Sequence, residues 1–364
     1  MKILTVNSGS TSVKLALFEA AAGGAPSCTG SERHEGASLD PQAVLGSLAA
    51  KLPAAPEVIA HRIVHGGTRF VRPARIDAAV LAAIEELSPL APLHNPQALR
   101  WVRAACALWP QAPQVAVFDT AFFSALPRVA AEYAVSAHLG ADQGVRRYGF
   151  HGIAHEAMWQ SWCRLVPELP QGGRLITLQL GGGCSIAAIE RGRPLDTSMG
   201  FSPLEGLVMA TRSGDIDPAS IAYLEQRLGR SGDQIVELLN TQAGLAGLSG
   251  GADSPAVLLQ DPAPQARFAI ELYCYRIRKY VGAYLAVLGG CDGIVFGGGV
   301  GEHVPGVRQR ALANLGWAGI ALDDALNQRA RGAARIDAGG VRIQVIPVDE
   351  ESTLARAAVA LLRV

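Results

Sequence analysis

The sequence predicts an α/β protein made of two related halves. Residues 3–18 form an apolar run, a short polar turn and a second run of alternating polarity, which is the pattern of a β-hairpin. The same order of features returns at residues 174–189, where the turn is rich in glycine. Such self-similarity indicates an internal repeat. A chain of 364 residues is long enough for two domains.

Composition restricts the partners of this protein. The 32 basic residues balance 32 acidic ones, so no net field attracts nucleic acid or an anionic membrane. The six cysteines contain no C-x-x-C pair, which argues against a zinc site or a disulfide framework. The N-terminus lacks the features of a signal peptide, and no apolar stretch is long enough to cross a bilayer. We therefore expect a cytoplasmic protein without nucleic-acid or membrane partners.

The elements of the first half follow from apolar periodicity. The Ala- and Pro-rich residues 20–55 are expected to lie at the surface. The pattern then predicts, in order, a strand at 57–60, helices near 77–87 and 97–108, and a buried strand at 115–118. This last strand places Asp119 at its C-terminal end.

In the second half, residues 196–218 are too irregular for one helix or one strand. Apolar residues from Ile270 to Leu288 recur at helical spacing and stop at Gly289-Gly290, which predicts a long amphipathic helix. The remaining pattern predicts a strand at 293–296, a glycine turn, a helix starting at Pro305, a strand at 344–348 and a final helix entered at 349–352.

Turns of small residues follow apolar strands at 7–12, 181–185 and 297–301. Small residues let backbone N–H groups approach an anion, as phosphate binding requires. None of these turns has the Gly-Lys-Ser/Thr of a Walker A loop or a dinucleotide-binding fingerprint. The pattern therefore indicates phosphate binding and disfavours a dehydrogenase.

Two arginines are candidates for binding a phosphoryl group. Arg212 lies between hydroxyl residues, with Asp215 and Asp217 just beyond, which suits an anion held beside a metal. The alternative is a solvated loop whose Asp and Ser residues form turns. Arg62 lies between His61 and His65 at the end of an apolar strand. The alternative for Arg62 is a structural ion pair.

Three further residues are candidates for chemistry. His151 lies between Gly149 and Gly152, which we expect to leave its ring room beside a ligand. Asp119 is placed to orient or deprotonate an acceptor, and Glu350 to hold Mg²⁺ through water. Each carboxylate has an alternative role as a helix N-cap or first-turn residue.

These residues resemble the acetate kinase family, within the acetate and sugar kinase, Hsc70 and actin superfamily. The resemblance covers nearly the whole chain and is carried by residues 6–14, 61–67, 91–96, 118–122, 147–152 and 196–218. It implies two actin-like (ribonuclease H-like) domains with a central cleft, a duplicated βββαβαβα plan and a homodimer. The implied domains are 1–120 with 349–364, which bind acyl and phosphate groups, and 121–348, which binds nucleotide and dimerises.

The resemblance implies reversible, direct in-line transfer of the ATP γ-phosphoryl group to acetate, giving acetyl phosphate and ADP. The implied metal is Mg²⁺, with Mn²⁺ as an alternative. Since a carboxylate nucleophile is already ionised at neutral pH, positioning and charge neutralisation must do most of the catalysis. The implied catalytic residues are Arg62 and Arg212 around the phosphoryl group, His151 on its oxygens, and Asp119, which aligns the carboxylate.

The resemblance also implies binding residues. Those for the acyl methyl are Val64, Leu93, Phe150 and Pro203. Those for ATP are Asn7, Ser10, Ser12, Lys14, Gly181, Gly182, Gly183, Asp253, Gly299, Val300 and Gly301, and those for the metal are Asn7 and Glu350. The pocket favours acetate, and propionate is the alternative acid because one methylene changes affinity by only about 1 to 3 kcal/mol.

The departures from the family lie on the nucleotide side. Gln179-Leu-Gly-Gly-Gly stands where the family usually has His-Leu-Gly-Asn-Gly. Gly251-Ala-Asp-Ser-Pro stands where the family has Ser-Ser-Asp-Met-Arg, so the arginine expected against adenine is absent. Another nucleotide or pyrophosphate is therefore an alternative donor. An actin-like nucleotide-binding protein without activity is disfavoured by the retained acyl-side residues, and a sugar kinase by the small apolar pocket.

Overall fold

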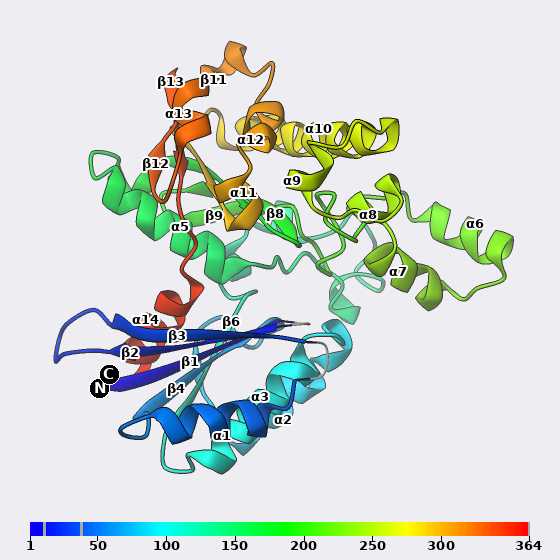
Figure 1. Ribbon diagram of the computed structural model, residues 1–364. Coiled ribbons are helices and arrows are strands. Elements are labelled where there is room, and N and C mark those ends of the chain that lie inside the picture. The colour runs from blue at the N-terminus through cyan, green and yellow to red at the C-terminus, as the bar shows by residue number, and fades with distance from the viewer. Residues whose placement is uncertain (10–11, 37–38, 363–364) are drawn as a thin grey trace. The chain divides into compact units, whose positions relative to one another are not determined.

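The computed structural model describes residues 1–9, 12–36 and 39–362. The chain forms two compact units, each built on its own β-sheet (Figure 1). Unit 1 comprises Met1–Ser124, Phe150–Ala157 and Asp349–Val364, and unit 2 comprises Ala125–Gly149 and Met158–Val348. No helix of the described residues is both long and apolar enough to cross a membrane.

The sheet of unit 1 has the strand order β3-β2-β1-β4-β6-β5. Its strands are β1 (Lys2–Ser8), β2 (Ser12–Glu19), β3 (Ser27–Glu35), β4 (Val58–Ile63), β5 (Ala74–Arg75) and β6 (Gln114–Phe118). The antiparallel pair β1 and β2 confirms the hairpin predicted at 3–18; Ser10 of its turn lies outside the described residues. Parallel pairing of β4 with β6 sets Ile63 opposite Phe118, so the C-terminal ends of both strands meet at one edge.

Helices cover both faces of this sheet (Figure 1). They are α1 (Pro41–Lys51), α2 (Ala78–Glu86), α3 (Asn95–Leu108) and α14 (Glu350–Leu362). Leu354 of α14 packs with Ile3 on one face, whereas Trp101 of α3 packs with Leu4 on the other. Successive strand residues point to opposite faces of a sheet, so the adjacent residues Ile3 and Leu4 of β1 pack into different hydrophobic cores.

The predicted helices near 77–87 and 97–108 and the strand at 115–118 are confirmed. The expectation that residues 20–55 form only a surface stretch is wrong. This part of the chain contains β3 and α1, and Leu45 of α1 is fully buried. Asp40 caps α1 by accepting a hydrogen bond from the backbone N–H of Gln42, and Pro41 is its first residue. This cap followed by proline is a helix-start signal that the alanine-rich composition concealed.

The sheet of unit 2 has the order β12-β14-β10-β7-β8-β9. Its strands are β7 (Arg174–Leu180), β8 (Cys184–Glu190), β9 (Arg193–Thr197), β10 (Gly293–Gly297), β12 (Ala334–Arg335) and β14 (Arg342–Val345); β11 (Ile320–Leu322) pairs with β13 (Asp337–Gly340) separately. An antiparallel three-strand meander joined to parallel strands occurs in both units. The predicted internal repeat and α/β class are therefore confirmed.

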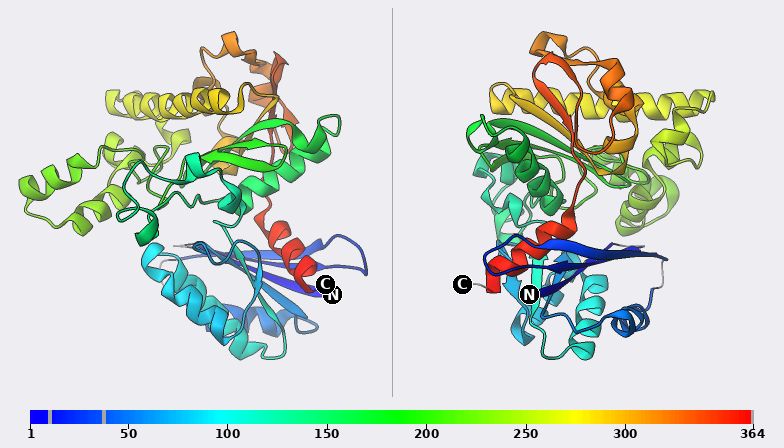
Figure 2. Two further views of the ribbon diagram at one scale, coloured as in Figure 1. Left: turned by 180° about the vertical axis from the view of Figure 1, so that it is seen from behind. Right: turned by 60° about the vertical axis from the view of Figure 1, so that its left-hand side comes forward.

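The long helix α10 (Pro264–Leu288) packs against β8 (Figure 2). It ends at Gly289, which has a left-handed backbone, as the sequence predicted. The other α-helices are α4 (Arg128–Ala131), α5 (Gly152–Leu165), α6 (Ala219–Leu228), α7 (Gly232–Thr241), α8 (Gly244–Ser249), α9 (Pro255–Leu258), α11 (Gly298–His303), α12 (Pro305–Ala311) and α13 (Asp324–Arg329).

The glycine segment 297–301 is not an open turn. Helix α11 begins at Gly298, so Gly299, Val300 and Gly301 are helical. A Cβ at Gly298 would lie 2.5 Å from the carbonyl oxygen of Leu180, and its φ is +75°. Glycine is therefore required there for close packing of the helix against β7. The segment 196–218 is irregular as predicted from residue 198 onward, where it contains neither helix nor strand, but Asp196 and Thr197 end β9.

Candidate active site

The adjacent ends of β4 and β6 bring Arg62 and Asp119 together in unit 1. Arg62 Nη2 lies 2.6 Å from Asp119 Oδ2, and Arg62 Nε donates to both carboxylate oxygens at 3.2 and 3.1 Å. Burial acts to lower the pKa of Arg62, but the charges of Asp119 and Glu350 outweigh it and hold the pKa above its ordinary value. The guanidinium is therefore permanently charged and fixed in one orientation.

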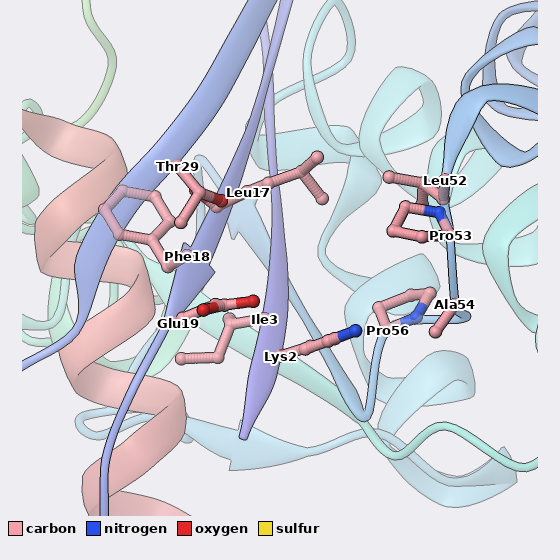
Figure 3. A pocket seen from close by; sticks show the side chains of 10 residues that line it. All are labelled: Lys2, Ile3, Leu17, Phe18, Glu19, Thr29, Leu52, Pro53, Ala54 and Pro56. Carbon is pink, nitrogen blue, oxygen red and sulfur yellow. The ribbon is translucent and has the colours of Figure 1, made fainter.

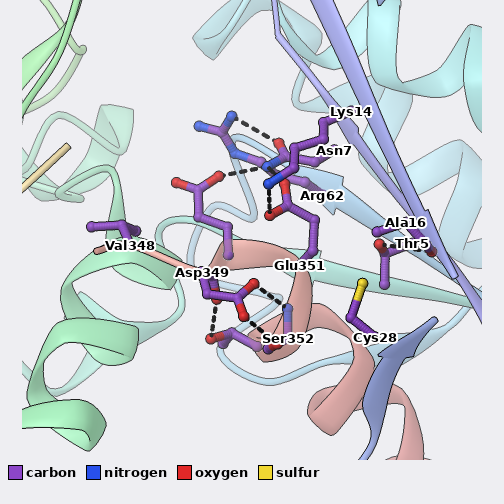
Figure 4. A network of polar contacts seen from close by, with 12 residues as sticks. Thr5, Asn7, Lys14, Ala16, Cys28, Arg62, Val348, Asp349, Glu351 and Ser352 are labelled. Atoms are coloured by element: carbon purple, nitrogen blue, oxygen red, sulfur yellow. Dashed lines mark hydrogen bonds and ion pairs between the residues drawn. The ribbon is translucent and has the colours of Figure 1, made fainter. Parts of the chain in front are cut away.

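Arg62 also belongs to a network of polar groups with Asn7, Lys14 and Glu351 (Figure 4). Asn7 Oδ1 accepts a hydrogen bond from Arg62 Nη1 at 3.2 Å. Asn7 Nδ2 donates to Glu350 Oε2 at 2.7 Å and to Glu351 Oε1 at 2.9 Å. Lys14 Nζ lies 2.7 Å from Glu351 Oε2. The N-terminal strands and the start of α14 thus share one network of charged groups.

Glu351 is a member of this network that the sequence did not single out. Its carboxylate is almost fully buried and contacts both Asn7 and Lys14. Lys14, expected to face nucleotide phosphates, has Glu351 as its partner here. A usable signal was the pair of glutamates in the first turn of the last helix, where carboxylates are favoured by the helix dipole.

The charge around Glu350 fits a magnesium ion. Burial raises the pKa of Glu350, and the nearby carboxylates of Asp119 and Glu351 raise it further against the opposing effect of Arg62. A cation beside these oxygens would relieve that repulsion, and Mg²⁺ prefers one or two carboxylates completed by water. Within the described ranges, no three His, Cys, Asp or Glu side chains form a metal-binding cluster. The residues present fit a metal held largely through water.

His151 lies at the start of α5, with a positive φ of 58°. Gly152, expected to leave room for the His151 ring, has a further packing role. A Cβ at Gly152 would lie 2.0 Å from the carbonyl oxygen of Asp119, and the N–H of Gly152 donates to that oxygen at 3.0 Å. The glycine therefore lets the backbone before α5 approach the residue that holds Arg62.

The predicted acyl-pocket residues of unit 1 differ in exposure. Val64, which follows β4, and Phe150 are buried, whereas Leu93 is 53% exposed. The Phe150 ring meets His65 edge-on at a centroid distance of 5.5 Å. Asn95, also buried, bonds the backbone N–H and C=O of His65 at 3.1 and 3.0 Å. These contacts fix the chain at His65, directly after Val64.

In unit 2, Arg212 occupies a different environment from Arg62. Its Nη1 donates to the carbonyl oxygen of Pro203 at 3.2 Å. Among the residues that the structure describes, no carboxylate forms an ion pair with Arg212, and burial lowers its pKa. A partly buried guanidinium without a counter-charge is suited to binding an anion.

Asp215 and Asp217, which the sequence places just beyond Arg212, both accept hydrogen bonds from other groups of unit 2. Asp215 accepts hydrogen bonds from the N–H of Gly206 and from the hydroxyl of Tyr280, both at 2.9 Å. Asp217 accepts from the N–H of Ala219 at 2.9 Å, at the start of α6. The local bond of Asp217 fits the alternative interpretation of a turn, whereas Asp215 bonds groups that are distant in the sequence.

The other predicted nucleotide-binding residues are distributed over both units. Ser12 begins β2, and its carbonyl oxygen accepts from the N–H of Gly9 at 2.8 Å. Between β7 and β8, Gly181 N–H donates to the carbonyl of Gly183, whereas Gly182 is exposed and a Cβ added to it would meet no atom within 4 Å. Asp253 is exposed between α8 and α9.

Unit 1 also contains a pocket (Figure 3). It is lined by residues of β1, β2 and β3 and by the segment after α1, including Leu17, Leu52 and Pro56. None of the predicted site residues lines it. Its lining is mostly apolar and includes one basic residue, Lys2, and one acidic residue, Glu19.

Comparison with known proteins gives consistent results. A family model described as the acetokinase family matches residues 47–356. The acetate kinase of Streptomyces coelicolor is 43% identical over 394 residues, which cover 99% of this chain and 97% of that protein. Among solved structures, the acetate kinase of Porphyromonas gingivalis has a TM-score of 0.88 and 36% identity, with 99% of each chain covered. A propionate kinase from Francisella tularensis has the same TM-score and 33% identity, also over 99% of each chain.

Proposed function

The chain belongs to the acetokinase family, and from this premise we propose that it transfers the γ-phosphoryl group of ATP reversibly to acetate, giving acetyl phosphate and ADP. The observation that carries the proposal is the 43% identity to an acetate kinase over 99% of the chain. The structure of another acetate kinase matches 99% of the chain in the same fold. The protein is accordingly a kinase and a transferase.

The reaction needs no proton transfer at the nucleophile. An acetate oxygen attacks the γ-phosphorus, one P–O bond forms, the bond to the β-phosphate oxygen breaks, and ADP leaves with the electron pair. Catalysis then depends on neutralising charge and aligning the reactants. The charged, oriented guanidinium of Arg62 suits the first task, and Asp119 fixes its orientation.

We assign the remaining catalytic roles by resemblance and chemistry. Arg212 binds the transferring phosphoryl group, because its guanidinium has no carboxylate partner in the described part of unit 2. His151 stabilises the phosphoryl oxygens. Glu350, oriented by Asn7, holds Mg²⁺ or Mn²⁺ through water. The metal would supply positive charge to the phosphate oxygens.

The wider organisation is part of the same proposal. Residues 1–120 with 349–364 bind the acyl and phosphate groups, and residues 121–348 bind the nucleotide and form a homodimer. The balanced charge and the cysteine pattern of the sequence support a cytoplasmic location.

Propionate is the second candidate acid, because a solved propionate kinase matches this fold with a TM-score of 0.88. The phosphoryl donor also has alternatives, which are another nucleotide or pyrophosphate. Gln179 replaces a family histidine, and its buried Oε1 has no hydrogen-bond partner in the described residues. This environment supports a contact between Gln179 and the phosphoryl donor that differs from the contact of the family histidine.

Trapping of the acyl phosphate as its hydroxamate tests the proposal. Purified protein with Mg²⁺ is assayed with acetate or propionate, each with ATP, GTP or pyrophosphate. We expect the highest kcat/KM with acetate and ATP, and a loss of about a thousandfold in Arg212→Ala, since an arginine at a transferring phosphoryl group contributes about 10³ or more. A preference for propionate or for another donor would correct that part of the proposal. No hydroxamate with any pair would overturn it.

A further inference from the structure

The two ends of the segment that carries Arg212 are hydrogen-bonded to each other. The N–H of Gly206 donates to Asp215 Oδ1 at 2.9 Å, and the N–H of Asp215 donates back to the carbonyl of Gly206 at 3.0 Å. A Cβ at Gly214 would lie 2.5 Å from the Gly206 carbonyl oxygen, and its φ is +70°. The segment 205–215 is therefore a tight loop whose two ends touch.

Its first end is held through Glu205. Arg147 Nη2 lies 2.7 Å from Glu205 Oε1, and the hydroxyl of Tyr133 donates to Glu205 Oε2. The same hydroxyl accepts from the N–H of Phe201 at 2.8 Å. A Cβ at Gly200 would lie 1.7 Å from Glu205 Oε2 and 2.1 Å from the Tyr133 hydroxyl. The Glu205 carboxylate and the Tyr133 hydroxyl therefore pack against Gly200, and a side chain there would displace them.

The second end is held through Asp215. Its Oδ2 accepts a hydrogen bond from the hydroxyl of Tyr280 at 2.9 Å. Tyr280 belongs to α10, which packs against the sheet of unit 2 at β8. One tyrosine thus ties each end of the loop to another part of the same unit.

Neither carboxylate is used to neutralise Arg212. Glu205 is paired with Arg147, and Asp215 with Tyr280 and the backbone. The Arg212 side chain instead contacts the carbonyl of Pro203 and, at 3.9 Å, the sulfur of Met209. The loop is therefore fixed by the contacts of Glu205 and Asp215, while Arg212 has no carboxylate partner among the residues that the structure describes.

We propose that Tyr133 and Tyr280 are positioning residues that hold both ends of the loop 205–215 so that Arg212 presents its guanidinium to the transferring phosphoryl group. This inference rests on the proposed function. The physical reason is that electrostatic stabilisation of a transition state requires donors fixed before the reaction, and misplacement by about 1 Å costs about a hundredfold in rate.

The first test compares Tyr280→Phe and Tyr133→Phe with the unmodified protein. Each substitution removes one hydroxyl and keeps the ring. We expect kcat for acetyl phosphate formation to fall about tenfold, with the KM for acetate changed less than about twofold. Tyr275→Phe is the matched control, because Tyr275 lies on the same helix and is 55% exposed. An unchanged kcat in both hydroxyl variants would overturn the inference.

A double-mutant cycle separates positioning of Arg212 from a general structural role. In an Arg212→Ala background, Tyr280→Phe should lower the residual kcat by less than about twofold, because the group that it positions is gone. A role in stability alone would give the same fold-loss in both backgrounds, and that result would contradict the proposal.

Calorimetric titration with inorganic phosphate distinguishes failure of this inference from failure of the proposed function. We expect Arg212→Ala to abolish phosphate binding and Tyr280→Phe to weaken it about tenfold, whether or not the protein turns over acetate. Phosphate binding that responds in this way without any transfer activity would reject the proposed function and support the positioning role. Equal phosphate affinity in Tyr280→Phe and the unmodified protein would reject the positioning role.

Discussion

Arg62 and Asp119, 57 residues apart in the sequence, are joined by three side-chain hydrogen bonds at the ends of β4 and β6. The pair is largely buried, since the side chain of Asp119 is 1% exposed and that of Arg62 is 15% exposed. The two interpretations of Arg62 from the sequence, a structural ion pair and a phosphoryl-binding group, are therefore compatible. It forms a structural ion pair, and the same pair orients the guanidinium for the proposed chemistry.

Asp119→Asn should lower kcat about a hundredfold, because the neutral amide no longer fixes Arg62 in its orientation and misplaced groups lose about that factor. Steady-state kinetics in both reaction directions measure this effect, with circular dichroism to verify folding.

The matched control for this change is Glu85→Gln, which breaks the ion pair of Glu85 with Arg103 at 2.9 Å. Both side chains of that pair are more than half exposed. Exposed pairs contribute about 0 to 1 kcal/mol, so neither kcat nor stability should change measurably. Retention of full activity by Asp119→Asn would show that the orientation of Arg62 does not limit turnover.

Glu350→Gln should raise the melting temperature at pH 8 in the absence of divalent metal. Burial and neighbouring carboxylates raise the pKa of Glu350 in the folded protein above its ordinary value of 4.5. The folded state therefore loses stability as pH rises through that raised pKa, and the neutral amide removes the loss.

The difference between the Glu350→Gln variant and the unmodified protein should vanish below about pH 4.5, where the carboxyl is protonated in both states. Glu86→Gln, on the exposed surface of α2, is the control. Mg²⁺ should stabilise the unmodified protein more than Glu350→Gln. A difference in melting temperature that grows toward acid pH would contradict the assignment.

Removing the His61–Gln114 pair should flatten the loss of stability in acid. Burial lowers the pKa of His61 from 6.5 to about 4, against the opposing effect of the hydrogen bond that His61 Nε2 donates to Gln114 Oε1. Because the folded state resists protonation, this stability is present above pH 6.5 and is lost as pH falls toward 4.

The double variant His61→Leu/Gln114→Leu should therefore lose about 1.4 kcal/mol less per pH unit across this window, the value for one linked proton. Urea unfolding at several pH values measures the slope. His303→Gln, at a 72% exposed side chain, should leave the slope unchanged. Parallel slopes in the His61 variant and the unmodified protein would rule out His61 as a source of acid sensitivity.

Gly152→Ala should destabilise the protein by about 1 to 3 kcal/mol, the usual cost of overpacking, because the new methyl group meets the Asp119 carbonyl at 2.0 Å. Activity should fall as well, since relief of the clash displaces Asp119. Gly46→Ala in α1 is the control, as no atom lies within 4 Å of its Cβ position. That change should stabilise by about 0.5 to 1 kcal/mol. Equal stabilities of the two variants would show that the chain accommodates the methyl group.

Several features of the site were predictable from local sequence. Asp119 follows a continuous apolar run, so its position at the end of a buried strand depended only on the period and length of that run. Arg212 lies in a segment whose glycines and charges exclude regular structure, and the structure has none there. By contrast, Glu351 and Tyr133 carried no local signal of their partners, which lie 337 and 72 residues away in the sequence.

The sequence by itself determined the duplicated α/β plan and the family, because apolar periodicity and motif spacing are properties of neighbouring residues. Only the tertiary structure decided which polar side chains pair. Lys14 binds Glu351 and Asp215 binds Tyr280, while Arg212 keeps no carboxylate partner in the described residues. The physical reason is that an ion pair depends on distance and burial, and strand pairing and helix packing set both.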